Sequence, residues 1–328
     1  MSTAINPVDW KILDWGFFVN EWPTIVGSDA AGQIVQLGSK VKDFKIGDRV
    51  LFQGVIGVQD SSTFQQFVTM PAELVGLTPK SVADDEAASV CLASMAVIAS
   101  FYHKDGLDIT PHPWQSGGEK AGNGKSIIIL GGSSSVGQYA IQLARLSGFS
   151  NIVTASSSTH HESLKALGAT VTLDRNTASP SDYAQAAKSY PLGAVLDSIS
   201  SPETGIEAVR ILQATNPDGV PSGTGLEQST MIHLLDPKPE ILEAAKESGK
   251  AQVSVKNVWG IGSAPHLRPT AIEFMKALSG ENGYLAKGEM KPNRPLVVKG
   301  GLASLEEALA KNKKGVSGEK VIIKPNEE

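Results

Sequence analysis

The sequence contains one cysteine, Cys91, among its 328 residues. A single thiol cannot form an intrachain disulfide framework or a four-cysteine zinc site, so we expect a reducing, cytoplasmic location. The chain also lacks a long basic block, and its formal net charge is -5. Nucleic acids and anionic membranes attract clustered Lys and Arg, so neither is expected as a partner. A small-molecule partner remains.

Long apolar runs are absent as well. No stretch reaches the ~18 consecutive apolar residues of a membrane-spanning helix, and the first residues do not resemble a signal peptide. The composition, with 41% hydrophobic and 19% charged residues, is that of a globular protein. Because single hydrophobic cores stop growing near ~250 to 300 residues, the length predicts two domains.

The pattern of apolar residues changes along the chain. Residues 25–52 alternate short apolar stretches with glycines, which predicts β-strands. Residues 84–103 are rich in alanine and predict one or two helices. Residues 104–125 form a long loop, which is either a lid or a plain insertion. The next hundred residues alternate strand and helix signals, and this rhythm predicts a parallel sheet with crossover helices.

The strongest local signal is SIIILGGSSSVGQYAIQLARLSG, where an aliphatic strand leads through small residues into an amphipathic helix. Gly132, Ser134 and Gly137 occupy the three glycine places of a G-x-G-x-x-G fingerprint. Small residues there let a pyrophosphate approach the backbone N–H groups of a helix N-terminus. The residues expected to contact the cofactor in this loop are Gly132, Ser133, Ser134, Ser135, Val136 and Gly137.

The end of the second strand predicts which nicotinamide nucleotide binds. An acid there binds the ribose of NAD and repels a 2′-phosphate. This chain has Ser156 at about that place, followed by Ser157, the pair His160 and His161, and Lys165. Hydroxyl and cationic groups suit a phosphate, so we expect NADPH. Alternatively, the histidines and Lys165 are the solvated face of the next helix.

Taken together, these motifs resemble the zinc-independent medium-chain dehydrogenases/reductases of the quinone-oxidoreductase and enoyl-reductase branch, particularly fungal members. The resemblance covers nearly the whole chain and is carried by NPVDWK, PTIVGSDAAGQIVQLGSKVKDFKIGDRV, FQQFVTMPAEL, DEAASV, LKALGAT, LDSISSPET and SGEKVIIKP. It implies an α/β fold: a GroES-like β-barrel catalytic domain, residues 1–94 and 262–328, with a Rossmann doubly wound parallel sheet, residues 95–261, inserted between. It also implies a possible homodimer and a cofactor contact at Ile199, within LDSISSPET.

The departures from the family are informative too. In zinc-dependent relatives a metal-binding Cys stands at the place of Asn6, and Gly-His-Glu stands where this chain has Gly27, Ser28 and Asp29. We therefore predict no metal. Some enoyl reductases carry a Tyr proton donor between the counterparts of Asp9 and Gly27, and this chain has none there. Relatives also have further strands ahead of NPVDWK, so we expect either another covering for that sheet edge or a truncated form with impaired activity.

The expected activity is NADPH-dependent hydride transfer to a conjugated enone, a quinone or a related carbonyl. Without a metal, hydrogen bonds or a cation must polarise the substrate oxygen. Asn6 and Lys11 are the catalytic residues that we predict, while Asp9 is expected to cap the local turn. Two alternatives stay open: an NADPH-binding protein with little turnover, and reduction of a carbonyl to an alcohol.

Overall fold

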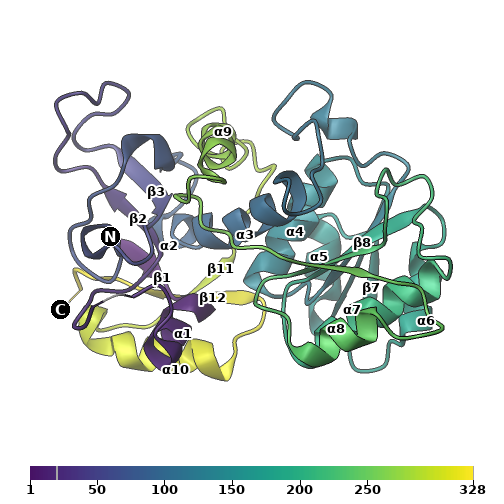
Figure 1. Ribbon diagram of the computed structural model, residues 1–328. Helices are drawn as coiled ribbons and strands as arrows, with labels where there is room; N and C mark the ends of the chain where they lie inside the picture. The colour runs from purple at the N-terminus through teal and green to yellow at the C-terminus, as the bar shows by residue number, and fades with distance from the viewer. Residues whose placement is uncertain (20, 328) are drawn as a thin grey trace. The chain divides into compact units, whose positions relative to one another are not determined.

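The computed structural model describes residues 1–19 and 21–327, and the chain forms two compact units (Figure 1). The first unit combines the two ends of the chain, Met1–Met95 and Ile261–Glu328. The second unit is the continuous segment Ala96–Gly260. Each unit is built around a six-stranded sheet, so the predicted α/β fold with a nucleotide-binding type of domain inserted in a second domain is confirmed.

The second unit contains a parallel sheet with the strand order β10-β9-β8-β5-β6-β7. The chain starts at β5 in the middle, moves outward through β6 and β7, and returns to β8 on the other side of β5. This reversal defines a doubly wound sheet, in which ligands bind beyond the carboxyl ends of the strands. The strands are β5 Ser126–Leu130, β6 Asn151–Ser156, β7 Val171–Asp174, β8 Leu192–Asp197, β9 Thr230–His233 and β10 Ser254–Asn257.

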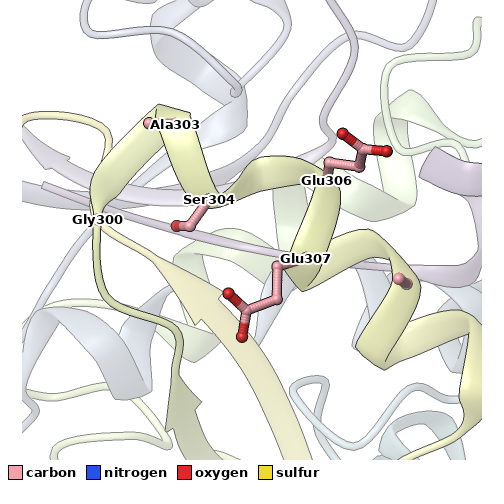
Figure 2. Close-up of a pocket in the computed structure, with 6 residues that line it drawn as sticks. Gly300, Ala303, Ser304, Glu306 and Glu307 are labelled. Atoms are coloured by element: carbon pink, nitrogen blue, oxygen red, sulfur yellow. The ribbon is translucent and has the colours of Figure 1, made fainter.

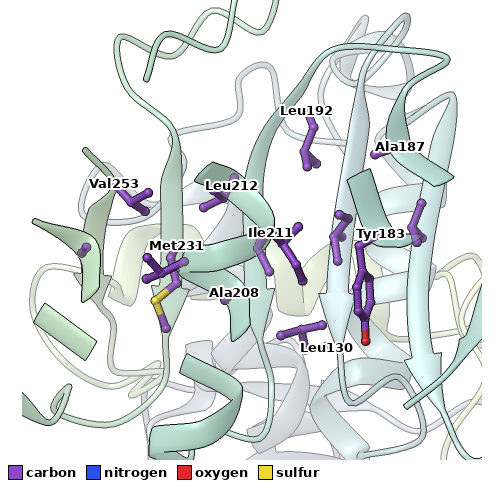
Figure 3. Packing of buried hydrophobic residues seen from close by; sticks show 14 of the residues in the cluster. Leu130, Tyr183, Ala187, Leu192, Ala208, Ile211, Leu212, Met231 and Val253 are labelled. Carbon is purple, nitrogen blue, oxygen red and sulfur yellow. The ribbon is translucent and has the colours of Figure 1, made fainter. Parts of the chain in front are cut away.

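Helices connect these strands and bury apolar side chains against them. Figure 3 shows Leu130 from β5 and Met231 from β9 in one core with Ile211 and Leu212 from a helix, all at most 2% exposed. The predicted alternation of strands and helices is confirmed in this unit. The helices are α4 Ser135–Leu146, α5 His161–Leu167, α6 Pro180–Ala187, α7 Pro202–Thr215 and α8 Pro239–Ala245, with short 3₁₀ turns η3 Gly118–Lys120 and η4 Ser158–His160.

The first unit is organised by a mixed sheet with the order β11-β12-β1-β2-β3-β4. In Figure 1 the start of the chain, in purple, and its end, in yellow, lie side by side because β1 pairs with β12. All neighbours are antiparallel except β11 and β12. The strands are β1 Ser2–Ala4, β2 Asp29–Gln33, β3 Arg49–Gln53, β4 Val75–Leu77, β11 Arg294–Val297 and β12 Glu319–Ile323.

Helices from both chain ends also pack together in this unit. Trp10 on α1 donates from Nε1 to Oδ1 of Asn312 on α10 at 3.0 Å, and Lys313 on α10 pairs with Asp14 at 2.8 Å. The helix pair therefore holds the sequence NPVDWK against the C-terminal part of the chain. The helices are α1 Pro7–Trp15, α2 Asp84–Ala87, α9 Arg268–Leu278 and α10 Leu305–Lys314, with 3₁₀ turns η1 Gln59–Ser61, η2 Ala72–Leu74 and η5 Gly301–Ser304.

The predicted helical region 84–103 forms α2 and the longer helix α3, Cys91–Tyr102. Within the described residues, the stretch Asp84–Tyr102 is long and apolar enough to cross a membrane, but 78% of it is buried inside the protein, as in an ordinary core helix. The loop that follows is held against α3, because the Trp114 ring lies 5.3 Å from the Tyr102 ring.

Candidate functional site

The bend after β5 is tight because it contains glycines at which no side chain fits. Gly131 has a φ of 75°, in the left-handed region that favours glycine. A Cβ added to Gly132 would lie 2.2 Å from Oγ1 of Thr154, and one added to Gly137 would lie 2.3 Å from the carbonyl oxygen of Gly131. The backbone of this bend is therefore closely packed and presents no bulky side chain to a ligand.

Helix α4 begins directly at this bend. Ser134 is its N-cap, and the Ser134 hydroxyl accepts a hydrogen bond from Gly137 N at 3.0 Å. The same hydroxyl lies 2.9 Å from the Ser198 hydroxyl. Ser133, Ser135 and Val136 complete the turn and are partly exposed. Because the first N–H groups of a helix lack intrahelical partners and carry its positive dipole end, this turn suits a pyrophosphate.

The register of the parallel strands brings three predicted segments to one edge. Leu130 on β5 lies opposite Ala155 on β6 and Asp197 on β8. The glycine-containing bend, the serines after β6 and the turn after β8 therefore meet at the carboxyl ends of the strands. Ile199 packs directly against the bend. A Cβ placed on Gly131 would lie only 2.5 Å from the Ile199 Cδ1 atom. This edge is the candidate cofactor site.

The residues predicted to select NADPH occupy the adjacent strand end. Ser156 is 1% exposed and its hydroxyl donates to the Ser157 carbonyl at 3.0 Å. Lys165 lies on α5, where its ammonium pairs with Glu162 at 2.9 Å. Arg175, which the sequence interpretation missed, follows β7 and donates its backbone N–H to the Ser156 carbonyl at 3.1 Å. Its position directly after the strand-like run ATVTLD is the sequence signal that marks it.

A second buried polar cluster lies in the other unit, around the start of α1. The Asp9 carboxylate accepts the Asn6 N–H at 2.7 Å, which confirms its predicted capping role, and it accepts the Ser28 hydroxyl at 3.0 Å. Lys320 on β12 is 3% exposed and donates from Nζ to Oδ1 of Asn6. Asp29 accepts the Leu92 N–H at 3.2 Å. The sequence interpretation missed Lys320 and gave Asp29 no role.

Burial controls the charges in this cluster. Loss of solvent raises the pKa of Asp9 to about 7, although the Asn6 N–H, the Ser28 hydroxyl and the Lys320 ammonium each favour its ionised form. Burial likewise raises the pKa of Asp29 to about 7 and lowers the pKa of Lys320 below its usual value. Two carboxyl groups that change protonation near neutral pH thus face one buried lysine.

Lys11 lies on the more exposed side of α1, beside aromatic rings. Its Nζ is 5.4 Å from the centre of the Trp10 ring and 5.7 Å from that of Trp15, distances at which a cation is attracted to an aromatic face. Burial against these rings lowers the pKa of Lys11. Both predicted catalytic residues therefore belong to one helix start, with Asn6 buried and Lys11 partly exposed.

The donor atoms around Asn6 do not fit a zinc ion. Zinc sites in proteins use Cys, His and carboxylate ligands, whereas Asn6 and Ser28 offer an amide and a hydroxyl. Over residues 1–19 and 21–327, no group of three or more His, Cys, Asp or Glu side chains is arranged to hold a metal. Cys91 is buried, and burial raises its pKa, which disfavours the thiolate that zinc binds.

The surface also has a shallow hollow at the start of α10, shown in Figure 2. Its polar side chains are Ser304, Glu306 and Glu307. Carboxylates repel a pyrophosphate and cannot polarise a carbonyl oxygen, so this hollow does not offer the chemistry of the cofactor site.

Comparison with known proteins agrees with this arrangement. Residues 1–80 match the alcohol dehydrogenase GroES-like domain, and residues 135–275 match the zinc-binding dehydrogenase domain. The trans-enoyl reductase himH of Aspergillus japonicus is 34% identical over 98% of this chain and 86% of its own length. A chloroplast envelope quinone oxidoreductase homolog of Arabidopsis thaliana is 31% identical over 54% of this chain and 51% of its own length.

Among solved structures, the quinone oxidoreductase of Escherichia coli, complexed with NADPH, has the same fold. It aligns with a TM-score of 0.69 and 17% identity over 99% of this chain and 89% of its own. The fold and the glycine-containing bend define a nicotinamide-type oxidoreductase. The chain belongs to the medium-chain dehydrogenase/reductase family, of the enoyl reductase and quinone oxidoreductase type.

Proposed function

We propose that this protein is an NADPH-dependent reductase that transfers hydride, without zinc, to a conjugated enone, a quinone or a related carbonyl compound. The observation that carries the proposal is the bend Gly131–Gly137, where added side chains would collide with backbone or with Thr154 while the start of α4 remains suited to an anion. A nicotinamide nucleotide bound there would supply the hydride.

The preference for NADPH rests on the end of β6. Ser156 stands where an acid would repel a 2′-phosphate, and Ser157 follows it in the chain. Arg175, whose backbone N–H donates to the Ser156 carbonyl, adds a cationic residue directly after the neighbouring strand, whereas the Lys165 ammonium is paired with Glu162.

The absence of fitting zinc ligands around Asn6 supports a reduction in which protein groups polarise the substrate oxygen. We assign this task to Lys11, because its lowered pKa and the adjacent aromatic faces suit a cation that contacts an apolar substrate. Asn6 stays a predicted catalytic residue. Its amide oxygen accepts from Lys320, and its amide nitrogen donates to the Ala4 carbonyl at 3.4 Å.

The proposal is tested by titrating the protein with NADPH and with NADH by fluorescence, and then adding a panel of enones and quinones. We expect tighter binding of NADPH and oxidation of NADPH by at least one class of acceptor. Tight binding without oxidation across the panel would instead support a nucleotide-binding protein with little turnover. Mass analysis of the product separates reduction of an alkene from reduction of a carbonyl to an alcohol.

Replacing Lys11 by Met is expected to lower kcat about 10- to 100-fold, because one charged hydrogen bond to a developing oxyanion is lost. The affinity for NADPH should stay unchanged, since Lys11 lies outside the nucleotide-binding unit. Lys313→Met is the matched control, because Lys313 also lies over the Trp10 ring, at 5.5 Å, but has no assigned role in the reaction. Equal kcat values for the two variants would contradict the role of Lys11.

A further inference from the structure

The turn after β8 is held by the carboxylate of Asp197, the last residue of that strand. Its Oδ1 accepts the backbone N–H groups of Ile199 at 3.0 Å and of Ser200 at 2.9 Å, and its Oδ2 accepts the Thr204 hydroxyl at 2.8 Å. Ser200 has a φ of 60°, in the left-handed region that residues other than glycine rarely adopt. The hydrogen bonds to Asp197 therefore fix a backbone conformation that is unfavourable on its own.

The same turn is connected to the start of α4 through two serine hydroxyls. The Ser198 hydroxyl donates to the Leu130 carbonyl at 2.6 Å, so its oxygen is left to accept from the Ser134 hydroxyl at 2.9 Å. The Ser134 oxygen in turn accepts the Gly137 N–H at 3.0 Å. The turn after β8 and the bend after β5 thus form one hydrogen-bonded network, all of it within the second unit.

A buried histidine on the neighbouring strand faces Asp197. His233, the last residue of β9, is 1% exposed, and Asp197 is 0% exposed. Nδ1 of His233 lies 2.6 Å from the Leu235 carbonyl oxygen, which can only accept, so Nδ1 carries a proton. Nε2 lies 3.8 Å from Oδ2 of Asp197 and has no hydrogen-bond partner within the described part of the chain. In a neutral ring, the Nε2 lone pair would face the carboxylate, whereas a second proton makes the contact an ion pair.

We propose that Asp197 and His233 are positioning residues for the nucleotide, and that one proton shared by the pair keeps the turn after β8 in the conformation that binds it. This inference rests on the proposed function and deepens it. Without that proton, Asp197 would place an uncompensated buried negative charge at the strand ends that receive an anionic nucleotide.

The surroundings of Asp197 favour retention of the shared proton. Burial raises the pKa of the Asp197 carboxyl, although its hydrogen bonds and His233 act in the opposite direction. Among the described residues, His233 on β9 and Glu207 on α7 face Asp197 with ionisable groups. A negative charge on Glu207 also disfavours the loss of this proton, because it would bring two like charges together.

Replacing Asp197 in two ways separates its hydrogen bonds from its charge. Asp197→Ala deletes every hydrogen bond from the carboxylate to the turn and should weaken NADPH and NADH about 100-fold. Asp197→Asn keeps an oxygen for the two backbone N–H groups, so both affinities should stay within about threefold of those of the wild type at pH ~6. Fluorescence titration measures the affinities, and the thermal midpoint is recorded for each variant.

The dependence of the Kd for NADH on pH distinguishes this role from a purely structural one. NADH lacks the 2′-phosphate, a group that itself titrates near pH ~6. Between pH ~6 and pH ~9 the Kd of the wild type should rise about 10-fold as the pair loses its proton. In Asp197→Asn the Kd should change less, because the neutral amide needs no proton on His233. The difference between the two proteins isolates the pair from other histidines near the site, such as His160 and His161.

His233→Asn removes the second partner of the pair. The shorter amide can still donate to the Leu235 carbonyl, but it brings no positive charge to Asp197. The Kd for NADH should therefore be about 10-fold higher than that of the wild type at pH ~6 and should no longer rise with pH. Together with Asp197→Asn, this variant decides the matter if Asp197→Ala does not fold.

Asn216→Ala is the matched control, because Asn216 connects the opposite ends of the same two strands. Its amide donates to the Leu192 carbonyl at 2.8 Å and to the Ser229 hydroxyl at 2.9 Å. Loss of these bonds should lower the thermal midpoint but leave both affinities within about threefold.

Wild-type affinity in a folded Asp197→Ala variant, or a wild-type pH profile in Asp197→Asn or His233→Asn, would overturn the positioning role alone. A wild-type protein that binds neither nucleotide would overturn the proposed function as well.

Discussion

Gly137→Asp should abolish binding of both NADPH and NADH. A Cβ at this position would lie 2.3 Å from the Gly131 carbonyl oxygen and 2.8 Å from the Gly132 Cα, so the bend would have to open. The new carboxylate would also face the pyrophosphate at a distance where like charges repel by about 4 kcal/mol, or roughly 1000-fold in affinity. Fluorescence titration of both nucleotides measures the loss.

Because opening the bend could also destabilise the unit, a second variant measures the effect of the negative charge without opening the bend. Ser135→Asp places a carboxylate in the first turn of α4, at a partly exposed position where the helix dipole stabilises it. This variant should lower the affinity for both NADPH and NADH by a factor of about 100. Ser304→Asp, the same exchange at the start of α10 in the other unit, should leave both affinities unchanged. Wild-type affinity in Ser135→Asp would refute the assignment of the bend to the pyrophosphate.

Ser156→Asp should invert the cofactor preference. The carboxylate would stand at the carboxyl end of β6, where it repels a 2′-phosphate and accepts hydrogen bonds from the ribose hydroxyls of NADH. We expect the Kd for NADPH to rise about 100-fold, corresponding to about 3 kcal/mol of repulsion, while the Kd for NADH stays constant or falls. The ratio of the two constants, measured on one protein preparation, reports the change independently of the fraction of active protein.

Ser158→Asp serves as the comparison, because Ser158 is exposed in η4, two residues further along the chain. It should change the ratio of the two constants by less than about threefold, since an exposed charge is screened by solvent. If Ser156→Asp left the ratio unchanged, the 2′-phosphate would have to bind elsewhere, and the preference for NADPH would lose its structural basis.

The fold could be predicted largely because the chain uses strong local patterns. The aliphatic runs that became β5, β6 and β8 are each followed by helix signals, and this order defines a doubly wound sheet. Strand β9 is hard to predict, because its four residues, Thr230–His233, stand in a stretch rich in Gly, Pro and Ser. Helix α6 does carry a local signal in the sequence, because Ser179 and Asp182 form a capping box at its start.

The two candidate sites differ in how far the sequence could predict them. The candidate cofactor edge is built from continuous segments, so motifs alone are enough to propose Gly132, Gly137 and Ser156. The polar cluster joins residues that are far apart in the sequence, since Lys320 is 314 positions from Asn6. A lysine in a closing strand-like segment has no local feature that marks it as buried. Only the pairing of β1 with β12 places it beside Asn6.

The position of Lys320 on β12 also affects when the first unit can fold during synthesis. Unit Ala96–Gly260 has all its strands as soon as that segment has left the ribosome. The first unit must wait, since β1 lacks one neighbour, and Asp9 and Asp29 lack their buried cation, until β12 emerges. Translation adds ~5 to 20 residues per second, so the interval between the emergence of β1 and that of β12 lasts on the order of half a minute. During translation, the early β-strands therefore remain exposed to aggregation while the inserted unit is already folded, and chaperones have their longest access to the N-terminal segment.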